Sequence, residues 1–415
     1  MRQMKDSGIE WVGDIPDNWE VNKTKYNFQY KKEIAGTKCN DYDRLALTMN
    51  NVVKRSKDDN SGLQPKEFET YQIIRQNELV FKLIDLQNVS TSRVGLSPYV
   101  GLVSPAYIIL RAIGKVLPPY AEKYFYVLWK NQIFNSLGDD GVRSNLGKED
   151  LLNIPMPIPP VEGQERIAEF LDKKCGEIDE LIADIKTQVQ TLEKYKRSVI
   201  TEAVTKGLNP SAEMKDSGIE WIGNVPAGWT INKIDSVYSL RNEKVSDKDY
   251  MPLSVTMKGI VPQLESAAKT NDGDNRKLVR KGDFAINSRS DRRGSCGISE
   301  LDGSVSLINL VLKPRGEMNN RYYNWLFHTE KFADEFYKWG HGIVDDLWTT
   351  RWIDMRKISV PMPPLSEQKE IADYLDNKCA QIEELISAKQ SQIETLESYK
   401  KSLIYEYVTG KKEVV

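Results

Sequence analysis

Polar side chains suited to binding duplex DNA cluster in the second half of this sequence. The stretch NSRSDRRGSCGIS (287–299) places one asparagine and three arginines among glycine and serine residues: Asn287, Arg289, Arg292 and Arg293. Arginine neutralises phosphates and reads guanine through paired hydrogen bonds, and asparagine can read adenine in the same way. The alternative interpretation is a solvated loop in which these arginines pair with Asp283 or Asp291.

A second polar stretch follows at GHGIVDDLWTTRWIDMRK (340–357). Its Thr349 and Arg351 can contact bases or phosphates, so both join the candidate site. Trp348 and Trp352 are separated by one helical turn and can also form one face of a buried helix. We favour that packing role for at least one of the two tryptophans.

The first half has polar stretches at the corresponding places. DLQNVSTSRVGLS (85–97) and GDDGVRSNLGKED (138–150) differ strongly from their counterparts, as expected of loops that read different targets. NNVVKRSK (50–57) adds a basic cluster suited to phosphate contacts. In this half the candidate DNA-binding residues are Thr48, Lys54, Arg55, Gln87, Asn88, Ser92, Arg93, Arg143 and Ser144.

The sequence lacks the motifs of common catalytic and nucleotide-binding sites. It has no phosphate loop GxxxxGK[ST], no GxGxxG after a strand, no HExxH and no GxSxG. The Asn-Pro-Pro-aromatic tetrapeptide of amino-methyltransferases is absent, and both histidines, His328 and His341, lie in the second half. We therefore expect a binding protein that has no catalytic residues, no metal and no cofactor of its own.

The composition of the chain is typical of a globular protein. Its 415 residues are 40% hydrophobic and 28% charged, with a net charge of −2, so any nucleic-acid surface must be a local patch. The length allows two or three domains, and 4 scattered cysteines indicate neither a disulfide framework nor a zinc site. Because no stretch resembles a membrane span or a signal peptide, we expect a cytoplasmic protein.

An internal repeat organises the chain. MKDSGIEW occurs at residues 4–11 and again at residues 214–221. A second long match joins PIPPVEGQERIAEFLD (157–172) to PMPPLSEQKEIADYLD (361–376). Because the two halves agree at their ends and diverge between them, we infer one scaffold that presents two different working surfaces.

Each half begins with a strand-rich α/β region. Short apolar runs such as NELVFKLI (77–84) and AYIILRAI (106–113) are separated by glycine, proline and asparagine turn residues. Helical patterns follow over residues 119–137 in the first half and over residues 320–339 in the second. The order of strands in the sheets cannot be predicted from these patterns.

A long helix follows the proline-rich segment of each half. Apolar residues recur there at spacings of four and three, which predicts a coiled-coil helix over residues 162–204 and over the equivalent stretch of the second half. Neither helix can leave its apolar stripe exposed, so we expect the two to pair. We favour antiparallel pairing, because parallel pairing would require residues 206–213 and the following domain to bridge the helix length. Cys175 and Cys379 fall on this seam as small buried residues.

Four tryptophans lie in the repeated opening motif, at Trp11, Trp19, Trp221 and Trp229. Glycine and proline residues separate them. We interpret them as residues that pack the start of each domain, or that dock a subunit, rather than as ligand contacts.

In combination these motifs resemble the specificity subunits of type I restriction-modification enzymes. DSGIEWVGDIPDNWEV (6–21) and DSGIEWIGNVPAGWTI (216–231) open the two halves, and the two proline-led helix starts quoted above continue the resemblance. GLVSPAYIIL (101–110) completes it in the first half, whereas the second half departs from it with GSVSLINLVL (303–312). The resemblance covers essentially the whole chain.

The resemblance implies an α/β (α+β) fold with two target-recognition domains, as pseudo-repeats joined by two long antiparallel coiled-coil helices. Each domain is expected to read one half of a split, asymmetric site in double-stranded DNA. The coiled coil is expected to set the spacing and to dock two modification subunits, which carry S-adenosylmethionine and methylate adenine; restriction subunits can join for cleavage. The implied boundaries are 1–160 for domain 1, 161–207 for the central helix, 208–364 for domain 2 and 365–415 for the C-terminal helix.

Two other classes of function stay open from the sequence. A coiled-coil scaffold whose α/β modules bind protein would not bind duplex DNA, whereas a protein that contacts phosphates must lose affinity for DNA steeply as salt rises. A stand-alone nuclease or methyltransferase is disfavoured by the missing motifs, and methyl transfer by the purified chain alone would establish it.

Overall fold

The computed structural model divides into two units that we describe separately. It describes residues 2–49, 51–59, 68–87, 92–137, 145–265, 273–342 and 348–414. Unit 1 comprises Met1–Ile185 and Ser391–Val415, and unit 2 comprises Lys186–Gln390. Below, domain 1 is the part of unit 1 that precedes residue 161, and domain 2 is the part of unit 2 over residues 208–364.

Domain 1 is built on two sheets among its described residues. Its strands are β1 (Met4–Asp6), β2 (Asp14–Pro16), β3 (Glu20–Lys23), β4 (Phe28–Tyr30), β5 (Arg44–Leu47), β6 (Val52–Arg55), β7 (Gln72–Ile74), β8 (Leu79–Phe81), β9 (Val94–Leu96), β10 (Gly101–Val103), β11 (Ile108–Ala112) and β12 (Pro155–Ile158). One sheet is antiparallel with the order β4-β11-β8-β9. The other has the order β6-β5-β10-β7, and in it β10 runs parallel to β5. The pairs β1-β2 and β3-β12 complete the strand pairing.

Domain 2 repeats the first of these sheets and splits the second. Its strands are β13 (Met214–Asp216), β14 (Asn224–Pro226), β15 (Thr230–Lys233), β16 (Tyr238–Arg241), β17 (Lys244–Val245), β18 (Leu253–Thr256), β19 (Gly259–Pro262), β20 (Arg276–Val279), β21 (Phe284–Asn287), β22 (Cys296–Ile298), β23 (Gly303–Val305), β24 (Asn309–Pro314) and β25 (Ser359–Met362). The order β16-β24-β21-β22 corresponds to the antiparallel sheet of domain 1. The described residues otherwise pair as β17-β20-β23, β18-β19, β13-β14 and β15-β25.

The repeated opening motif forms the same hairpin in both domains. In domain 1 the Asp6 carboxylate accepts a 2.9 Å hydrogen bond from the amide of Gly8, and in domain 2 Asp216 accepts one of 3.0 Å from Gly218. Gly8 and Gly218 have φ angles of 67° and 72°, which side chains disfavour, so the motif needs glycine there. Trp19 and Trp229 are buried behind these hairpins, which confirms a packing role for this pair.

The two predicted helical stretches before the proline segments are each broken in the structure. In domain 1, α1 (Pro118–Lys130) and α2 (Ile133–Leu137) are separated at Gln132, whose φ of 58° is left-handed. In domain 2, α5 (Asn320–Phe327) and α6 (Glu330–Lys338) are separated by Thr329. The Thr329 hydroxyl accepts the amide hydrogen of Phe332 at 3.2 Å and so starts a new helix. The short helices α3 (Lys148–Asn153) and α7 (Trp352–Met355) precede the last strand of each domain.

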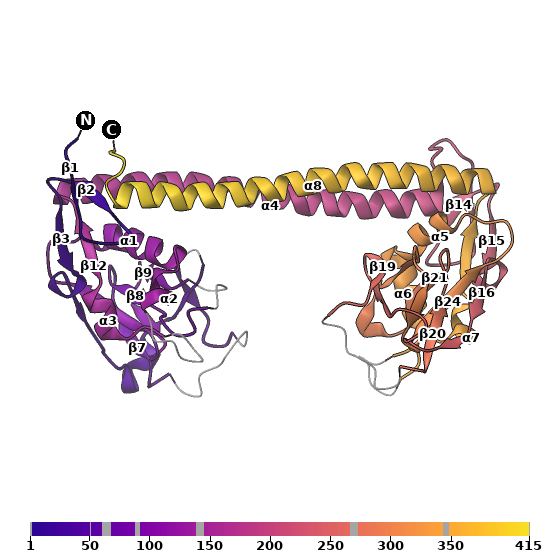
Figure 1. Cartoon of the computed structure of the whole chain (residues 1–415), viewed down its shortest axis with the longest axis horizontal. Helices are drawn as coiled ribbons and strands as arrows, with labels where there is room; N and C mark the ends of the chain where they lie inside the picture. Colours follow the sequence, from indigo (N-terminus) through magenta and orange to yellow (C-terminus); the bar gives the residue numbers. More distant parts are fainter. Residues whose placement is uncertain are drawn as a thin grey trace. The chain divides into compact units, whose positions relative to one another are not determined.

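The predicted long helices are confirmed as α4 (Val161–Lys206) and α8 (Leu365–Val408). In unit 1, Phe170 of α4 packs against Tyr407 of α8 with ring centroids 4.6 Å apart, and Asp179 pairs with Lys400 at 2.7 Å. In unit 2, the Gln188 side chain accepts a 2.5 Å hydrogen bond from Lys389, and Lys196 pairs with Glu383. Residue numbers fall along α8 as they rise along α4, so the helices pair antiparallel in each unit (Figure 1). The seam buries Cys175 and Cys379, and burial raises the pKa of both thiols.

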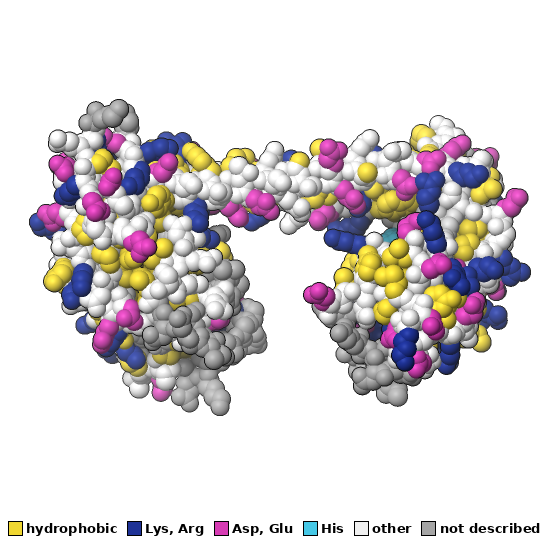
Figure 2. Space-filling view, in the orientation of Figure 1, with side chains coloured by type: hydrophobic (Ala, Val, Ile, Leu, Met, Phe, Trp, Pro, Cys, Tyr) yellow, Lys and Arg dark blue, Asp and Glu magenta, His cyan; other side chains and the backbone are white. Residues whose placement is uncertain are grey.

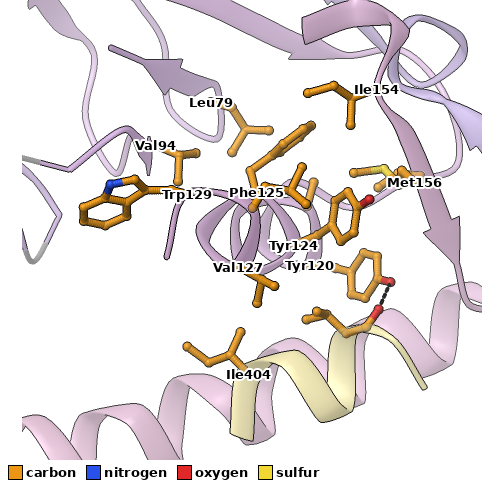
Figure 3. Close-up of a cluster of buried hydrophobic side chains, with 14 of the residues drawn as sticks. Leu79, Val94, Tyr120, Tyr124, Phe125, Val127, Trp129, Ile154, Met156 and Ile404 are labelled. Carbon is orange, nitrogen blue, oxygen red and sulfur yellow. Dashed lines mark hydrogen bonds between the residues drawn. The ribbon is translucent and has the colours of Figure 1, made fainter. Parts of the chain in front are cut away.

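The core of each domain extends onto both long helices. In domain 1, α1 packs between the antiparallel sheet and the helices, where Phe125 faces Leu79 and Val127 faces Ile404 (Figure 3). The Tyr120 hydroxyl lies 2.9 Å from the carbonyl oxygen of Val408 at the end of α8. In domain 2 the Tyr322 hydroxyl lies 2.9 Å from the carbonyl of Val204 at the end of α4. Each domain is thus anchored to the helix that belongs to the other repeat.

None of the helices in the described part of the chain is both long and apolar enough to cross a membrane.

Candidate nucleic-acid interface

The two candidate loops of domain 2 lie together. The amide of Ser290 donates a 2.9 Å hydrogen bond to the carbonyl of Trp348, and the amide of Thr350 donates one of 3.0 Å to the carbonyl of Ser288. Arg289 and Thr349 thereby form an isolated antiparallel bridge. Residues 287–293 and 348–351, which we name loop pair 2, therefore form one surface although about 60 residues of sequence separate them.

The corresponding loops of domain 1 also meet. The Asn145 side chain accepts a 3.0 Å hydrogen bond from the amide of Asp85, and the amide of Leu146 donates one of 3.0 Å to the carbonyl of Leu83. We name residues 82–87 and 145–148 loop pair 1. The structure thus joins, in each domain, the two stretches that the sequence identified separately.

Matched glycines allow the second sheet to approach the strands that carry these loops. A Cβ atom at Gly95 of β9 would lie 2.6 Å from the Leu47 side chain, and one at Gly297 of β22 would lie 2.7 Å from the main chain of Gly259. Real Cβ atoms do not approach so closely, so a side chain at Gly297 would have to displace main chain, whereas one at Gly95 would have to displace the end of the Leu47 side chain. The matched glycines thus have a packing role, which is the close approach of the neighbouring strand.

Loop pair 2 is rich in arginine held by weak surface contacts. Asp291 pairs with Arg289 at 3.1 Å and with Arg292 at 3.8 Å, and the Arg292 side chain is 68% exposed. Arg351 pairs with Asp354 at 3.4 Å and is 65% exposed. Exposed ion pairs of this kind contribute about 0–1 kcal/mol, so these arginines can exchange their carboxylates for phosphates or base edges.

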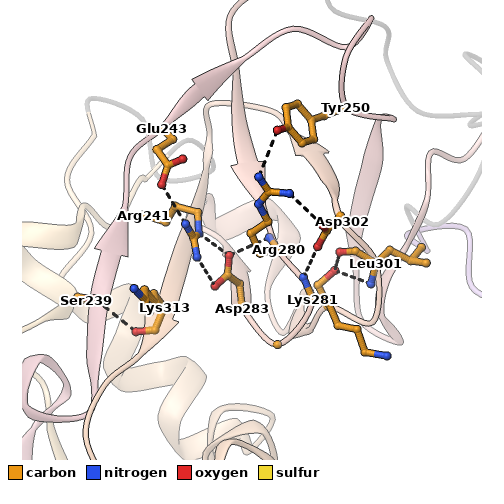
Figure 4. Close-up of polar contacts among 12 residues, drawn as sticks. Ser239, Arg241, Glu243, Tyr250, Arg280, Lys281, Asp283, Leu301, Asp302 and Lys313 are labelled. Atoms are coloured by element: carbon orange, nitrogen blue, oxygen red, sulfur yellow. Dashed lines mark hydrogen bonds and ion pairs between the residues drawn. The ribbon is translucent and has the colours of Figure 1, made fainter.

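The other candidates of loop pair 2 are more constrained. The Asn287 side-chain oxygen accepts the amide hydrogen of Arg289 at 3.1 Å, and within the described residues its side-chain NH2 group donates to no other group. Thr349 is half-buried and exchanges two main-chain hydrogen bonds of 3.1 Å with His341. Asp283, considered above as a partner for the loop arginines, instead pairs with Arg241 at 2.6 Å (Figure 4).

Arg293 points away from the rest of loop pair 2. It forms an ion pair with Asp334 and lies at the edge of a groove of about 1830 Å³ between domain 2 and the long helices (Figure 2). The groove is also lined by Lys196, Arg197 and Trp325. Arg293 can therefore contact a ligand in the groove, or stabilise α6 through its ion pair with Asp334. Its position favours these two roles over a contact with DNA beside Arg292.

Ser92 and Arg93 are buried in domain 1 and do not form part of its exposed surface. The Arg93 guanidinium donates a 3.2 Å hydrogen bond to the carbonyl of Ile84 and a further one to the carbonyl of Asp85. The Ser92 hydroxyl donates to the carbonyl of Val94 at 2.7 Å. Burial lowers the pKa of Arg93, because the charged guanidinium loses contact with water. We therefore leave both residues out of the proposed DNA surface and assign them the shaping of loop pair 1.

The remaining candidates of domain 1 fall into two groups. Gln87 is exposed at the end of the described part of its loop. Thr48, Lys54 and Arg55 lie on the β5-β6 hairpin, where Lys54 pairs with Asp43 at 2.7 Å and Arg55 with Asp59 at 2.7 Å. The hydrogen bond with Asp43 raises the pKa of Lys54. Asn88, Arg143 and Ser144 lie outside the described residues.

Sequence patterns did not reveal that Arg289 meets Thr349 or that His341 joins them. The His341 imidazole lies 3.5 Å from the Asp354 carboxylate, which Arg351 also contacts. Trp352 packs against the core of domain 2, as favoured for at least one of the two neighbouring tryptophans. Arg351 is the polar residue at the N-cap position of the one-turn helix α7, after a loop. A polar residue in that position is the sequence signal that could have indicated this cluster.

The family whose description reads "Type I restriction modification DNA specificity domain" matches the chain twice, over residues 19–191 and over residues 226–395. The chain belongs to this family. Each match spans one domain and much of the long helix that follows it, so the two halves of this specificity subunit are two copies of one family unit.

Relatives of this specificity subunit are known from Methanocaldococcus jannaschii. The chain is 24% identical over 392 residues to a protein named for the specificity subunit of the MjaX type I restriction enzyme, covering 88% of this chain and 87% of that protein. It is 26% identical over 172 residues to the MjaVIII type I restriction enzyme specificity subunit, covering 41% and 38%.

A solved structure from a study of complex assembly and conformational transition of the type I restriction-modification system has the same fold. The TM-score is 0.68 at 15% identity, and the match covers 96% of this chain and 99% of that chain. At this identity the likeness concerns the fold alone.

Proposed function

We propose that this specificity subunit reads a bipartite, asymmetric DNA site, with loop pair 1 reading one half-site and loop pair 2 the other. The observation that carries the proposal is that two copies of one family unit keep the same scaffold and differ in the loops that the scaffold brings together. A shared scaffold with unlike polar surfaces suits two different targets.

The subunit itself is proposed to be non-catalytic. Double-stranded DNA is its ligand, and two modification subunits are its protein partners, with restriction subunits as further partners for cleavage. S-adenosylmethionine belongs to the modification subunits, whereas the chain described here takes no cofactor. The absence of the common catalytic motifs from the sequence supports this division of work.

Mapping methylated adenines in a host genome, with and without this chain, tests the proposal. The expected result is one bipartite motif with a fixed gap, which disappears when the chain is absent. An unchanged methylation pattern, or duplex binding whose affinity does not fall with salt, would favour the protein-binding scaffold instead. Methyl transfer by the purified chain alone would contradict the non-catalytic assignment.

The antiparallel helices are proposed to set the gap between the half-sites. Inserting or deleting seven residues in both α4 and α8 preserves the heptad seam, so the helices should still pair. The methylated motif should then keep both half-sites and change the length of its gap. An unchanged gap would contradict this role.

A further inference from the structure

Four exposed cations gather at one corner of domain 2, away from any residue considered so far. They are Lys233 at the end of β15, Arg315 just after β24, and Arg356 with Lys357 between α7 and β25. We name these four residues the basic corner. Figure 2 shows lysine and arginine side chains over this part of domain 2, around β16 and α7.

Main-chain contacts bring the four residues together from distant parts of the chain. Lys233 lies opposite Ser359 in the β15-β25 pair, and Lys357 comes two residues before Ser359. The amide of Asp235 donates a 3.3 Å hydrogen bond to the carbonyl of Arg356. The amide of Arg315 donates one of 2.8 Å to the carbonyl of Val237. The corner is therefore fixed by sheet and 3-10 helix contacts rather than by flexible side chains.

The positive charge of the basic corner is largely uncompensated. Among the residues that the structure describes, none of the four cations has an ion-pair partner within 4.0 Å. The Arg315 guanidinium instead donates to the main-chain carbonyl of Asp235 at 3.4 Å. Asp235, Glu317 and Asp354 are close in sequence to the four cations, but the Asp354 carboxylate contacts Arg351 and His341. In loop pair 2, by contrast, each arginine has a carboxylate beside it.

The equivalent corner of domain 1 is also basic but holds its charge at other positions. Lys23 corresponds to Lys233, and the exposed Lys25 and Lys115 stand where domain 2 has Asp235 and Glu317. The same hydrogen bond, from Ile113 to Asn27 at 2.8 Å, places an isoleucine where domain 2 has Arg315. The residues that lie three and two positions before the last strand are Leu152 and Asn153 rather than Arg356 and Lys357. Ile113 is 55% exposed, so this corner is partly apolar. The two corners thus share one lysine, whereas the cations at Arg315, Arg356 and Lys357 are particular to domain 2.

We propose that the basic corner binds phosphates of duplex DNA outside the half-site read by loop pair 2. This proposal rests on the proposed function. α7 alone separates Arg351 of loop pair 2 from Arg356, a distance of roughly 7.5 Å along the helix axis. A duplex in contact with loop pair 2 can therefore continue onto the basic corner, and exposed arginine and lysine without carboxylate partners suit phosphate oxygens.

The occupant is identified as DNA because the corner continues from the loops proposed to read DNA. An acidic protein surface would be the alternative occupant, and the test below separates the two.

The test uses the full chain assembled with its modification subunits and the variant Arg315→Ala/Arg356→Ala/Lys357→Ala. The probes are duplexes that carry the mapped site and have either long or short flanks on the side of the second half-site. The matched control is Lys244→Ala/Lys248→Ala/Lys281→Ala, which removes the same charge from exposed positions elsewhere on domain 2. All six side chains are exposed, so neither variant should disturb folding, and thermal melting checks this.

We expect the corner variant to lower the slope of log K against log salt by about 2–3 on the long-flank duplex, close to 0.9 for each lost phosphate contact. On the short-flank duplex the corner variant and the wild type should have the same slope, and the methylated motif should be unchanged. The control variant should keep the wild-type slope on both duplexes.

Two outcomes would overturn the basic corner as a DNA contact. One is a slope equal to that of the control variant on the long-flank duplex. The other is weaker assembly with the modification subunits at an unchanged slope, which would indicate an acidic protein partner. If the wild-type complex itself fails to bind the mapped site, the proposed function fails as well; if it binds and the variants match it, only the inference about the corner fails.

Discussion

Domains 1 and 2 bury a carboxylate at the same place but take its arginine from different strands. Glu78 precedes β8 and Asp283 precedes β21, and each accepts a main-chain hydrogen bond from the residue three positions earlier, at 2.7 and 2.8 Å. In domain 1 the arginine is Arg111 of β11, and in domain 2 it is Arg241 of β16 (Figure 4). The turn before the strand therefore requires the carboxylate, whereas its cation can come from any strand within reach.

The loop pairs show the opposite behaviour. Their position is conserved between the domains, because strand ends and matched glycines fix it, but their side chains are not. Beside loop pair 1, Arg93 is buried among carbonyl groups, whereas Arg292 and Arg351 of loop pair 2 are exposed. Comparison of the two domains thus separates residues that maintain the scaffold from residues free to change with the target.

The largest expected effect comes from removing the buried carboxylates. Asp283→Ala leaves the nearly buried Arg241 with only the 62% exposed Glu243 as a carboxylate partner and should destabilise domain 2 by about 3 kcal/mol. Glu78→Ala should cost less, because the Arg111 side chain is already 34% exposed and can be hydrated. Hydrogen exchange of β21 amides in the first variant and β8 amides in the second measures both effects. Equal losses of stability in the two variants would show that the exposure of the arginine does not determine the free-energy cost of removing its carboxylate.

A smaller difference is expected at the matched glycines. In Gly297→Ala the new Cβ meets the main chain of Gly259 at 2.7 Å, so the β-strands must move, at a cost of about 2 kcal/mol. In Gly95→Ala it meets the flexible end of Leu47 at 2.6 Å, which can rotate away, at a cost of about 1 kcal/mol. Denaturant unfolding measures the loss of stability in each variant. A larger loss in Gly95→Ala than in Gly297→Ala would mean that the Leu47 side chain is more tightly held than the Gly259 main chain.

The exposed residues of the loop pairs should act on one half-site each. Arg292→Ala is expected to weaken binding roughly tenfold and to relax the sequence requirement only at the half-site read by domain 2. Gln87→Ala should relax only the other half-site. Methylation of duplex libraries with one half-site randomised at a time checks this, and a simultaneous change at both half-sites would contradict one reader for each domain.

The smallest expected effect is the change in stability with pH. It should differ between the two domains, because both histidines lie in domain 2. Burial lowers the pKa of His328 below its usual value of 6.5. The unfolded chain then binds a proton more readily than the folded one, so stability present above pH 6.5 is lost as the pH falls towards the lowered pKa. The loss is at most about 1.4 kcal/mol per pH unit.

Protection factors for exchange, measured between pH 7.5 and 5.5, test this titration. Those of β22, which holds the neighbouring Cys296, should fall more than those of β9 in domain 1. His328→Asn should remove this difference. A difference that persists in the variant would assign the pH dependence to another group.

Much of the fold could be predicted from the repeat and the heptads. The repeat predicted that the two halves share a scaffold, and the heptads predicted α4 and α8 to within two residues at each end of the first helix. These features are local or periodic, and periodicity is what a sequence records most directly. The breaks at Gln132 and Thr329 were missed, because a single left-handed residue or one capping hydroxyl interrupts an otherwise continuous apolar pattern.

The candidate site was only partly predictable. The polar stretches were found as separate segments, but neither their pairing across about 60 residues nor the burial of Arg93 follows from composition. A charged residue in a polar loop looks the same in a sequence whether it faces solvent or a ring of carbonyl groups.

The sequence by itself determined that this specificity subunit is two copies of one unit, each ending in a helix that must find an apolar partner. The tertiary structure decided which polar residues meet, which of them are exposed, and how four cations from distant segments form the basic corner of domain 2. The physical reason is that these choices depend on strand order and on main-chain hydrogen bonds between distant segments, which arise only when the sheets close around their cores.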